Sequence, residues 1–345
     1  MCVKDTGTKY QLWISDFNID GTFTRVHPFI ISHTKTMTRT REDGKEEVFS
    51  ACIKSDDTRY LGGNKSSSVN AIKLQGRPRT SINYDKANEF CANRGDWVTM
   101  IDYLEYCAIQ ALCYIEYASF DNQAALNTNL TSDGFKQGGL GAGVTNLNWY
   151  RWTAFNGNNP IVQTYWTAEH NIGNGSTNGD HYELGNYNTD GSSLSTYPAV
   201  YRGILNFFGD IWTFIRDIVV INKDKDYNAV YLLKKGVNHS DVTKDNVNEK
   251  CYLIGHQANI NNFITEFDFQ RGVYFIPNKV GSNKKADYNW IRGSDRQNTD
   301  KAVLVLLLGG GAANGSWAGS GGFNSAWVRS DSRTNVGFFT TVKLD

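Results

Sequence analysis

Along much of the chain, hydrophobic and polar residues alternate with a period of two, and this pattern predicts a protein built mainly from short β-strands. Residues 10–15 and 22–31 show this alternation or an enrichment in β-branched residues. Asp43-Gly44 and the Gly-Gly-Asn sequence at 62–64 are turn signals. We therefore expect residues 1–80 to form short strands separated by polar turns.

Two helices are predicted next. Asn83 can cap a helix over residues 84–94, and Gly95 is a typical stop. Thr99-Met-Ile-Asp102 matches a capping box with Asp in place of Glu, and it predicts a second helix ending near Tyr117. Apolar residues recur in this second helix at helical spacing, so we expect it to be buried; they are Leu104, Cys107, Ala108, Ala111, Leu112 and Ile115.

From about residue 120 to residue 200 the chain is polar and rich in Gly, Asn and Thr, yet it keeps several tryptophans and tyrosines. Because disordered segments lack such aromatic residues, this stretch predicts long ordered loops. Strands are expected again after residue 201, and two of them should form a hairpin around the polar turn at 222–228. The strands lie at residues 211–221, 229–233, 251–254, 273–276, 302–308 and 337–344.

The last predicted loop is the most informative segment. Residues 309–335 are packed with Gly, Ser and Asn and carry two isolated tryptophans, Trp317 and Trp327. Such a segment has little apolar side chain to bury, so we expect it to hold irregular backbone against a core and to present aromatic side chains outward. Rigid scaffolds display binding surfaces in this way. The segment therefore favours a binding protein.

Composition excludes several partners. Lys plus Arg equals Asp plus Glu at 35 each, so the chain lacks the positive surplus that a general grip on nucleic acid or anionic membrane needs. The longest apolar run, residues 302–308, is too short to span a bilayer, and we expect no membrane insertion. Residues 1–7 lack the apolar core of a secretory signal, so we expect synthesis in a cytoplasm.

Neither a metal nor a catalytic residue is nominated. Asn222, Asp224 and Asp226 imitate the start of a calcium loop, but Tyr227 stands where such a loop needs Gly, and a solvated hairpin turn is the preferred interpretation. The Asp180-His181 pair in the Gly- and Asn-rich loop could hold a metal, but ordinary surface side chains are the preferred interpretation. The six cysteines form no C-x-x-C pair, and buried free thiols are expected rather than disulfides or metal ligands.

Two local motifs carry a resemblance to known proteins. Residues 201–212, Tyr-Arg-Gly-Ile-Leu-Asn-Phe-Phe-Gly-Asp-Ile-Trp, resemble the R-G-x-x-N-x-x-G-x-x-W element that formylglycine-generating-enzyme-like domains share with lectin-fold phage proteins. Residues 78–91, followed by Gly-Asp-Trp at 95–97, resemble the first-helix segment of the same group. The resemblance implies that the aromatic residues Phe207, Phe208 and Trp212 lie in the core and that Gly209 allows a tight turn.

The C-terminal stretch resembles the variable region of lectin-fold proteins that are diversified by retroelements, from Gly309-Gly310 to Asn335-Val336-Gly337 without gaps. One departure is Ala312, where the family often has Trp. The resemblance implies a ligand-binding surface of outward-facing residues, namely Ala313, Asn314, Trp317, Asn324, Ala326, Trp327, Asp331 and Arg333. Trp and Arg are common among residues that dominate binding energy. The alternative is that both tryptophans belong to the core.

The order of these features, over residues 27–345, resembles the C-type lectin fold and implies an α+β architecture: two helices plus a twisted antiparallel sheet with long ordered loops. We expect an N-terminal strand or attachment segment at 1–26 and a lectin-like domain at 27–345. That domain would include a loop-rich insert at about 120–200 and a C-terminal display region at 309–337.

The resemblance implies a bacteriophage virion protein, a tail fibre or receptor-binding component, that binds a host-surface glycan or protein without catalysis or cofactor. Partners would also include other virion proteins and further copies of the chain, by analogy in a trimer. Formylglycine generation needs a late cysteine pair, and no Cys follows Cys251. The alternatives are a structural decoration protein of the head or tail and a cell-surface depolymerase.

Overall fold

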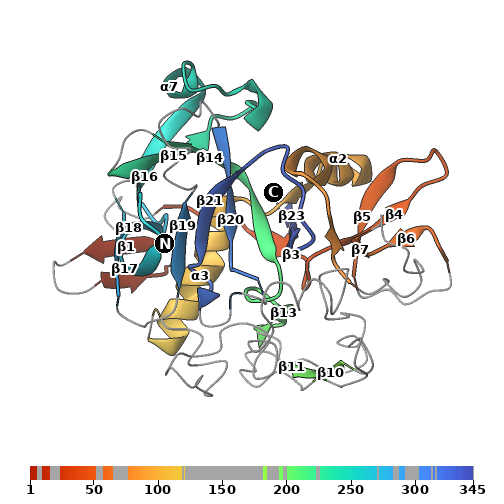
Figure 1. The fold of residues 1–345 in the computed structure, drawn as a ribbon, viewed down its shortest axis with the longest axis horizontal. Coiled ribbons are helices and arrows are strands. Elements are labelled where there is room, and N and C mark those ends of the chain that lie inside the picture. Colours follow the sequence, from red (N-terminus) through yellow and green to blue (C-terminus); the bar gives the residue numbers. More distant parts are fainter. Residues whose placement is uncertain are drawn as a thin grey trace.

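The computed structural model describes residues 1–5, 10–15, 24–51, 57–64, 77–118, 120, 182–184, 194–196, 200–222, 226–269, 272–282, 287–291, 303–311, 314 and 317–344. Within them the protein is α+β, with few helices and many short strands (Figure 1). The predicted insert at about 120–200 falls almost wholly outside these ranges. The residues described there are Phe120, a short hairpin of β10 (Tyr182–Leu184) and β11 (Leu194–Thr196), and the first residue of the next strand.

A mixed sheet forms the centre of the molecule. Its strands follow the order β16, β15, β14, β20, β21, β19, β17, β18, and β22 pairs with β14. Their bounds are β14 (Trp212–Asn222), β15 (Tyr227–Leu233), β16 (Cys251–Ala258), β17 (Asn262–Asp268), β18 (Ile276–Gly281), β19 (Tyr288–Ile291), β20 (Val303–Leu308), β21 (Phe323–Val328) and β22 (Val336–Gly337). The two end strands, β16 and β18, pack against each other, so the sheet is nearly closed.

Smaller sheets surround this centre. Strand β23 (Thr340–Lys343) runs between β3 (Phe29–Ile31) and β9 (Val98–Met100) and is antiparallel to both, so the C-terminal strand pairs with a strand near the N-terminus. The arm seen at the right of Figure 1 contains a three-stranded sheet in the order β5, β4, β6. The remaining strands are β1 (Cys2–Asp5), β2 (Tyr10–Trp13), β4 (Met37–Thr40), β5 (Glu46–Phe49), β6 (Tyr60–Leu61), β7 (Gly63–Asn64), β8 (Arg79–Thr80), β12 (Val200–Tyr201) and β13 (Ile204–Leu205).

The first predicted helix is confirmed at both ends. Helix α2 (Tyr84–Arg94) begins where the Asn83 side chain accepts a hydrogen bond from the Lys86 amide at 2.9 Å. It ends at Gly95, whose amide bonds back to the Cys91 carbonyl. Its buried residues form the cover of a core cluster that also includes Trp212, Phe214 and Leu307 of the central sheet.

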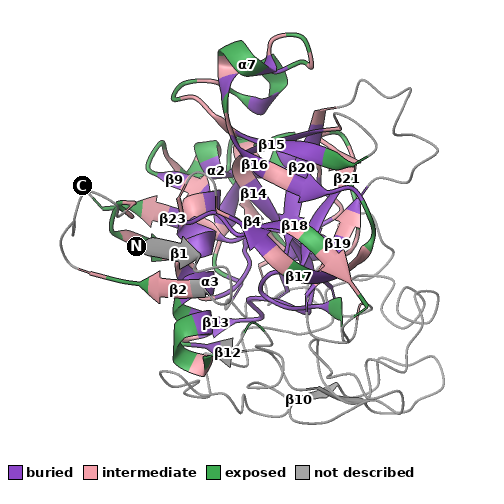
Figure 2. Cartoon of the chain, turned by 90° about the vertical axis from the view of Figure 1, so that its left-hand side faces the viewer, coloured by how far each residue is buried: buried purple, intermediate pink, exposed green. Residues whose placement is uncertain are grey.

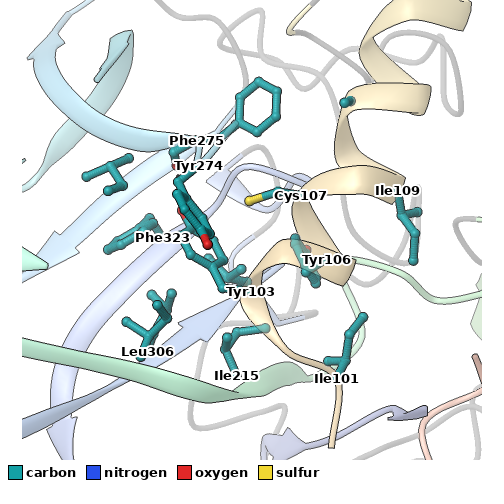
Figure 3. Close-up of a cluster of buried hydrophobic side chains, with 14 of the residues drawn as sticks. Ile101, Tyr103, Tyr106, Cys107, Ile109, Ile215, Tyr274, Phe275, Leu306 and Phe323 are labelled. Carbon is teal, nitrogen blue, oxygen red and sulfur yellow. Dashed lines mark hydrogen bonds between the residues drawn. The ribbon is translucent and has the colours of Figure 1, made fainter. Parts of the chain in front are cut away.

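The second helix, α3 (Tyr103–Tyr117), starts at a different cap from the predicted one. Its capping box is formed by Asp102 and Glu105, whereas Thr99 belongs to β9, because the residues before Asp102 are already paired with β23. The predicted apolar face is partly wrong too, since Leu112 and Ile115 are exposed. The buried face instead carries tyrosines, which pack against Phe323 and Leu306 of the sheet and against Phe275 just before β18 (Figure 3).

The hairpin predicted around residues 222–228 is confirmed, since β14 and β15 pair as antiparallel strands. The predicted strand at 273–276 begins only at Ile276, because the residues before it form a buried turn that packs against α3. The sheet is not purely antiparallel as expected. Both β14–β22 and β19–β21 are parallel pairs.

The prediction that the display region is a loop that adds nothing to the core is wrong. Strand β21 lies inside it and pairs with both β20 and β19 in the central sheet. Phe323 is fully buried in the larger core cluster, and Ala318 is fully buried as well. Figure 2 shows this buried centre in purple. Two neighbouring strands supply the pairing that the composition of the segment alone does not indicate.

The residues of the R-G-x-x-N-x-x-G-x-x-W element lie as predicted. Its aromatics Phe207, Phe208 and Trp212 are buried, and Gly209 has a positive φ of 87°. Nothing in the described residues tests the predicted boundary between residues 1–26 and the rest of the chain. Met1 and Leu12 pack with the larger core cluster. No helix among the described residues has both the length and the apolar character to cross a bilayer.

Candidate binding surface

Trp317 is the most exposed of the predicted ligand-binding residues that carry a large apolar side chain. Its side chain is 41% exposed, yet it is held in place by stacking on Tyr288. The two ring centroids are 4.9 Å apart and the rings are inclined by 23°. The Trp290 ring meets Trp317 edge-on at 6.3 Å. Because its neighbours fix this indole while leaving it accessible, it needs little further ordering to contact a ligand.

Tyr288 and Trp290 owe their position to the alternation of strand β19. They are half-buried on one face, whereas Asn289 and Ile291 are buried on the other. Trp290 continues inward to the buried Trp212, with ring centroids 4.9 Å apart and planes at 86°. We name Tyr288, Trp290 and Trp317 the aromatic surface. Its rings extend from solvent to the core without a break.

Asn289 fixes strand β19 from the opposite face. Its amide nitrogen donates to the carbonyls of Ala258 at 2.8 Å and Ile260 at 2.9 Å. Its side-chain oxygen accepts from Gln257 at 2.7 Å. Buried amides that are bonded on both sides stiffen the backbone that carries them. The aromatic surface is therefore built on a rigid strand, although β19 is only four residues long.

Trp327 lies in β21 and is half-buried against the core cluster beneath α2. The exposed Arg333 places its guanidinium 4.6 Å from the centre of the Trp327 ring, a cation–π contact. The indole nitrogen of Trp327 is buried without a hydrogen-bond partner in the described structure. This tryptophan therefore offers a ligand less surface than the sequence predicted, and Arg333 covers part of it.

Of the other predicted residues, Asn324 is buried and three are half-buried. The prediction is wrong for Asn324, which is 6% exposed and accepts a hydrogen bond from the Ala326 amide. Asn314 and Asp331 are half-buried and hold turns, because their oxygens accept from the amides of Gly311 at 2.7 Å and Val328 at 3.0 Å. Ala326 is half-buried. Ala313 and its neighbour Ala312 lie outside the described residues.

Sequence analysis missed Tyr288 and Trp290. The available signal was the period-two order of Tyr288-Asn-Trp-Ile291, in which aromatic residues alternate with others. The segment is short and stands apart from the recognised motif, so its place beside Trp317 follows only from the parallel pairing of β19 with β21. Trp317 and Trp327 are consequently not equivalent. Trp317 joins the missed pair, whereas Trp327 packs against the core beneath α2.

Buried charges lie behind the display region. The Lys35 ammonium donates to the Asn206 carbonyl at 2.6 Å and lies 4.7 Å from the Phe339 ring centre. Burial lowers the pKa of Lys35, and burial raises the pKa of Asp210, each being opposed by the charge of the other. The Asp210 carbonyl lies close beneath Gly311. Both charged side chains are buried, so ligands do not reach them.

Among the residues that the structure describes, the aromatic surface contains only the aromatic side chains Tyr288, Trp290 and Trp317 by definition, and its chemistry is that of contact and stacking. Among the described residues, no three His, Cys, Asp or Glu side chains are grouped so as to hold a metal ion. The cysteines Cys91, Cys107, Cys113 and Cys251 are buried thiols outside any disulfide. Burial raises the pKa of Cys91 to about 12 and that of Cys251 to about 11, which makes both poor nucleophiles at neutral pH.

No protein-family model matches this chain, and no curated protein matches it either. Its function is therefore inferred from the residues described above and from the resemblance of its motifs.

Proposed function

We propose that this protein is a bacteriophage virion protein with a C-type lectin fold, a tail fibre or receptor-binding component. It binds a glycan or protein on the host surface through the aromatic surface, with Trp317 as the principal contact. It acts without catalysis or cofactor, is made in the host cytoplasm, and joins the virion together with other virion proteins as a homo-oligomer, by analogy a trimer.

The order of elements supports the proposed fold. Helices α2 and α3 precede the long segment at about 120–200, and the strands of the central sheet follow, with the display region near the end of the chain. The core positions of Phe207, Phe208 and Trp212 agree with the motif that carries the resemblance. Fold alone does not assign function, so the proposal depends on the surface.

Trp317 is the observation that carries the proposed binding function. An indole that is 41% exposed and stacked on a half-buried tyrosine presents a large apolar face in a fixed orientation. Tryptophan and tyrosine supply large contact areas at a small entropic cost, and they dominate many binding interfaces. A sugar ring or a flat peptide surface would pack on such a face.

The test compares two exposed tryptophans. Trp317→Ala is expected to weaken binding of the purified protein to host cells by about 30-fold or more, since a central ring contact contributes about 2 kcal/mol. Trp97→Ala removes a tryptophan that is 60% exposed after helix α2, and it should leave binding unchanged. Binding is measured with labelled protein on a panel of intact bacteria and on arrayed envelope glycans. The melting temperature of Trp317→Ala should stay within a few degrees of the parent.

Several results would reject the proposal. Unaltered binding of Trp317→Ala would remove the aromatic surface from recognition. If the protein binds no cells or glycans, but phage particles carrying Trp317→Ala lose it, the decoration role replaces the adhesin role. Release of oligosaccharides from envelope material by the purified protein would indicate a depolymerase instead.

A further inference from the structure

A concave feature lies apart from the aromatic surface. It is a cleft of about 1190 Å³ between α2, β9, the middle of β14, the end of β15 and the C-terminal strand. None of the described residues of the predicted ligand-binding set lines it. We name it the α2 cleft. Charged residues on its wall include Arg25, Asp102, Arg216, Asp217, Lys235 and Lys343.

An irregularity in strand β14 places two of these charges in the cleft. The pairing of β14 with β20 shifts register between Ile215 and Val219, and Arg216 and Asp217 occupy the interrupted stretch. The Arg216 amide bonds instead to the Ile101 carbonyl at 3.1 Å. Bulges of this kind redirect side chains and occur often beside functional sites. Here both residues become half-buried wall residues instead of continuing the regular ladder.

Arg216 has few partners for its five N–H donors. One guanidinium nitrogen contacts the Asp102 carboxylate at 3.5 Å, a long separation for a hydrogen bond. The Nε atom is buried with no hydrogen-bond partner in the described structure. Buried donors are normally satisfied, so an orphaned one requires an explanation. The Arg216 side chain as a whole is 31% exposed and lines the cleft, so a ligand in the cleft can contact it.

The nearby acids are already engaged. Asp102 accepts from the Lys343 ammonium at 2.8 Å and from the Glu105 amide at 2.9 Å. Asp217 accepts from the Tyr103 amide at 2.9 Å, so both carboxylates serve the start of helix α3. Burial, followed by the neighbouring Asp102 charge, raises the pKa of Asp217 and reduces its negative charge near neutral pH.

The wall as a whole is slightly cationic. It carries five Lys or Arg residues and four Asp residues. One of these acids, Asp85, is paired with Arg329, which does not line the cleft. Two of the cations, Arg25 and Lys235, are exposed. Together with Arg216, these cations give the cleft a small surplus of positive charge, which favours an anion over a cation.

We propose that the α2 cleft binds a small anionic ligand whose carboxylate or phosphate group is held by Arg216. A guanidinium presents paired N–H groups in a plane, and this geometry matches the two oxygens of either anion. The cleft is larger than a typical small-molecule pocket, which leaves room for a sugar-sized body attached to the anion. This site is independent of the proposed adhesin function, because it shares no described residue with the aromatic surface.

Isothermal titration calorimetry with three probes built on one sugar ring tests the proposal. Glucuronate carries a carboxylate, glucose 6-phosphate carries a phosphate, and glucose carries neither. At least one charged probe should bind the full chain more than tenfold more tightly than glucose. The stronger of the two identifies the anion. Binding of neither charged probe at millimolar concentration, or equal binding of glucose, would overturn the proposal.

Variants assign the binding to Arg216. Arg216→Gln should lower the affinity for the bound probe at least tenfold, whereas Arg59→Gln, an exposed arginine in the arm that is paired with Asp57, should leave it unchanged. If Arg216→Gln lowers the melting temperature sharply, Arg216→Lys and Lys235→Gln replace it. Arg216→Lys should weaken binding about fivefold, and Lys235→Gln should weaken it about twofold. Full affinity in Arg216→Gln, or in both replacements, would overturn the assignment.

One further variant separates the two sites. Trp317→Ala should retain the full affinity for the charged probe, because Trp317 does not line the α2 cleft. Loss of probe binding in Trp317→Ala would overturn the proposed location. Failure of the protein to bind host cells would leave a positive titration result in place, so the two proposals fail separately.

Discussion

At the scale of single residues, the glycines that follow β20 decide where the display region runs. Gly309 and Gly310 have φ values of 91° and 73°, a region that glycine adopts at little cost. A Cβ atom on Gly310 would lie 2.7 Å from the Cβ of Ala318, which is fully buried. The chain can therefore fold back on itself here only because two small residues meet.

Gly310→Ala should destabilise the protein by about 2–4 kcal/mol, since it adds a steric clash to an unfavourable φ. Gly44→Ala is the matched control, because Gly44 has a φ of 80° and a methyl group added there would meet no atom within 4 Å. The control should cost about 1 kcal/mol from the backbone alone. Urea unfolding of both variants measures the difference, and equal losses would show that the contact with Ala318 is not restrictive.

At the scale of elements, helix α3 is fixed mainly at its first turn. The capping box joins Asp102 and Glu105, and Asp217 caps a further amide. Glu105 also accepts from Thr341 of β23, so the start of the helix is tied to the C-terminal strand. Along the helix, Tyr106 stacks on Phe207 with centroids 4.6 Å apart. The polar cap and the aromatic face of α3 therefore both anchor this helix.

Two substitutions at Asp102 should separate the cap from the ion pair. Asp102→Asn keeps an oxygen for the Glu105 amide but loses the charge that faces Lys343, and it should cost about 1 kcal/mol. Asp102→Ala loses both and should cost about 2–3 kcal/mol. Chemical denaturation measures the two losses. An equally large loss in both variants would mean that the charge, and not the cap, stabilises this turn.

At the scale of the whole molecule, β23 joins the two ends of the chain. It lies between β3 and β9, so residues from 29 to 343 meet in one small sheet. As the central strand of three, β23 has ladder partners on both sides, and a proline within it removes one backbone hydrogen bond. The pairing of β23 with β3 and β9 thus joins distant parts of the chain, and the packing of α3 depends on it through Thr341.

Thr341→Pro should destabilise the protein by about 3 kcal/mol or more and broaden its thermal unfolding transition, because the loss spreads from β23 to α3. Leu344→Ala changes an exposed residue just after the strand and should alter stability by about 0.5 kcal/mol or less. Calorimetry of both variants checks this. A sharp, parent-like transition in Thr341→Pro would show that the terminal sheet is dispensable.

The sequence by itself determined the features that arise from neighbouring residues. The start and end of α2 follow from Asn83 and Gly95, and the β14–β15 hairpin follows from two apolar runs around a polar turn. Local backbone preferences and side-chain periodicity act over a few residues, so a pattern in the chain is enough to find them. Even there, the cap of α3 was misplaced by three residues, because pairing with β23 takes Thr99 into a strand.

Only the tertiary structure decided which side chains meet and which are covered. Strand β21 lies in a segment whose Gly-, Ser- and Asn-rich composition is typical of a loop, and it forms because β20 and β19 lie on either side of it. The same pairing brings Tyr288 and Trp290 beside Trp317, while the core beneath α2 takes up Trp327. Burial is a property of contacts between segments that are distant in the chain, and the local pattern carries no record of those partners.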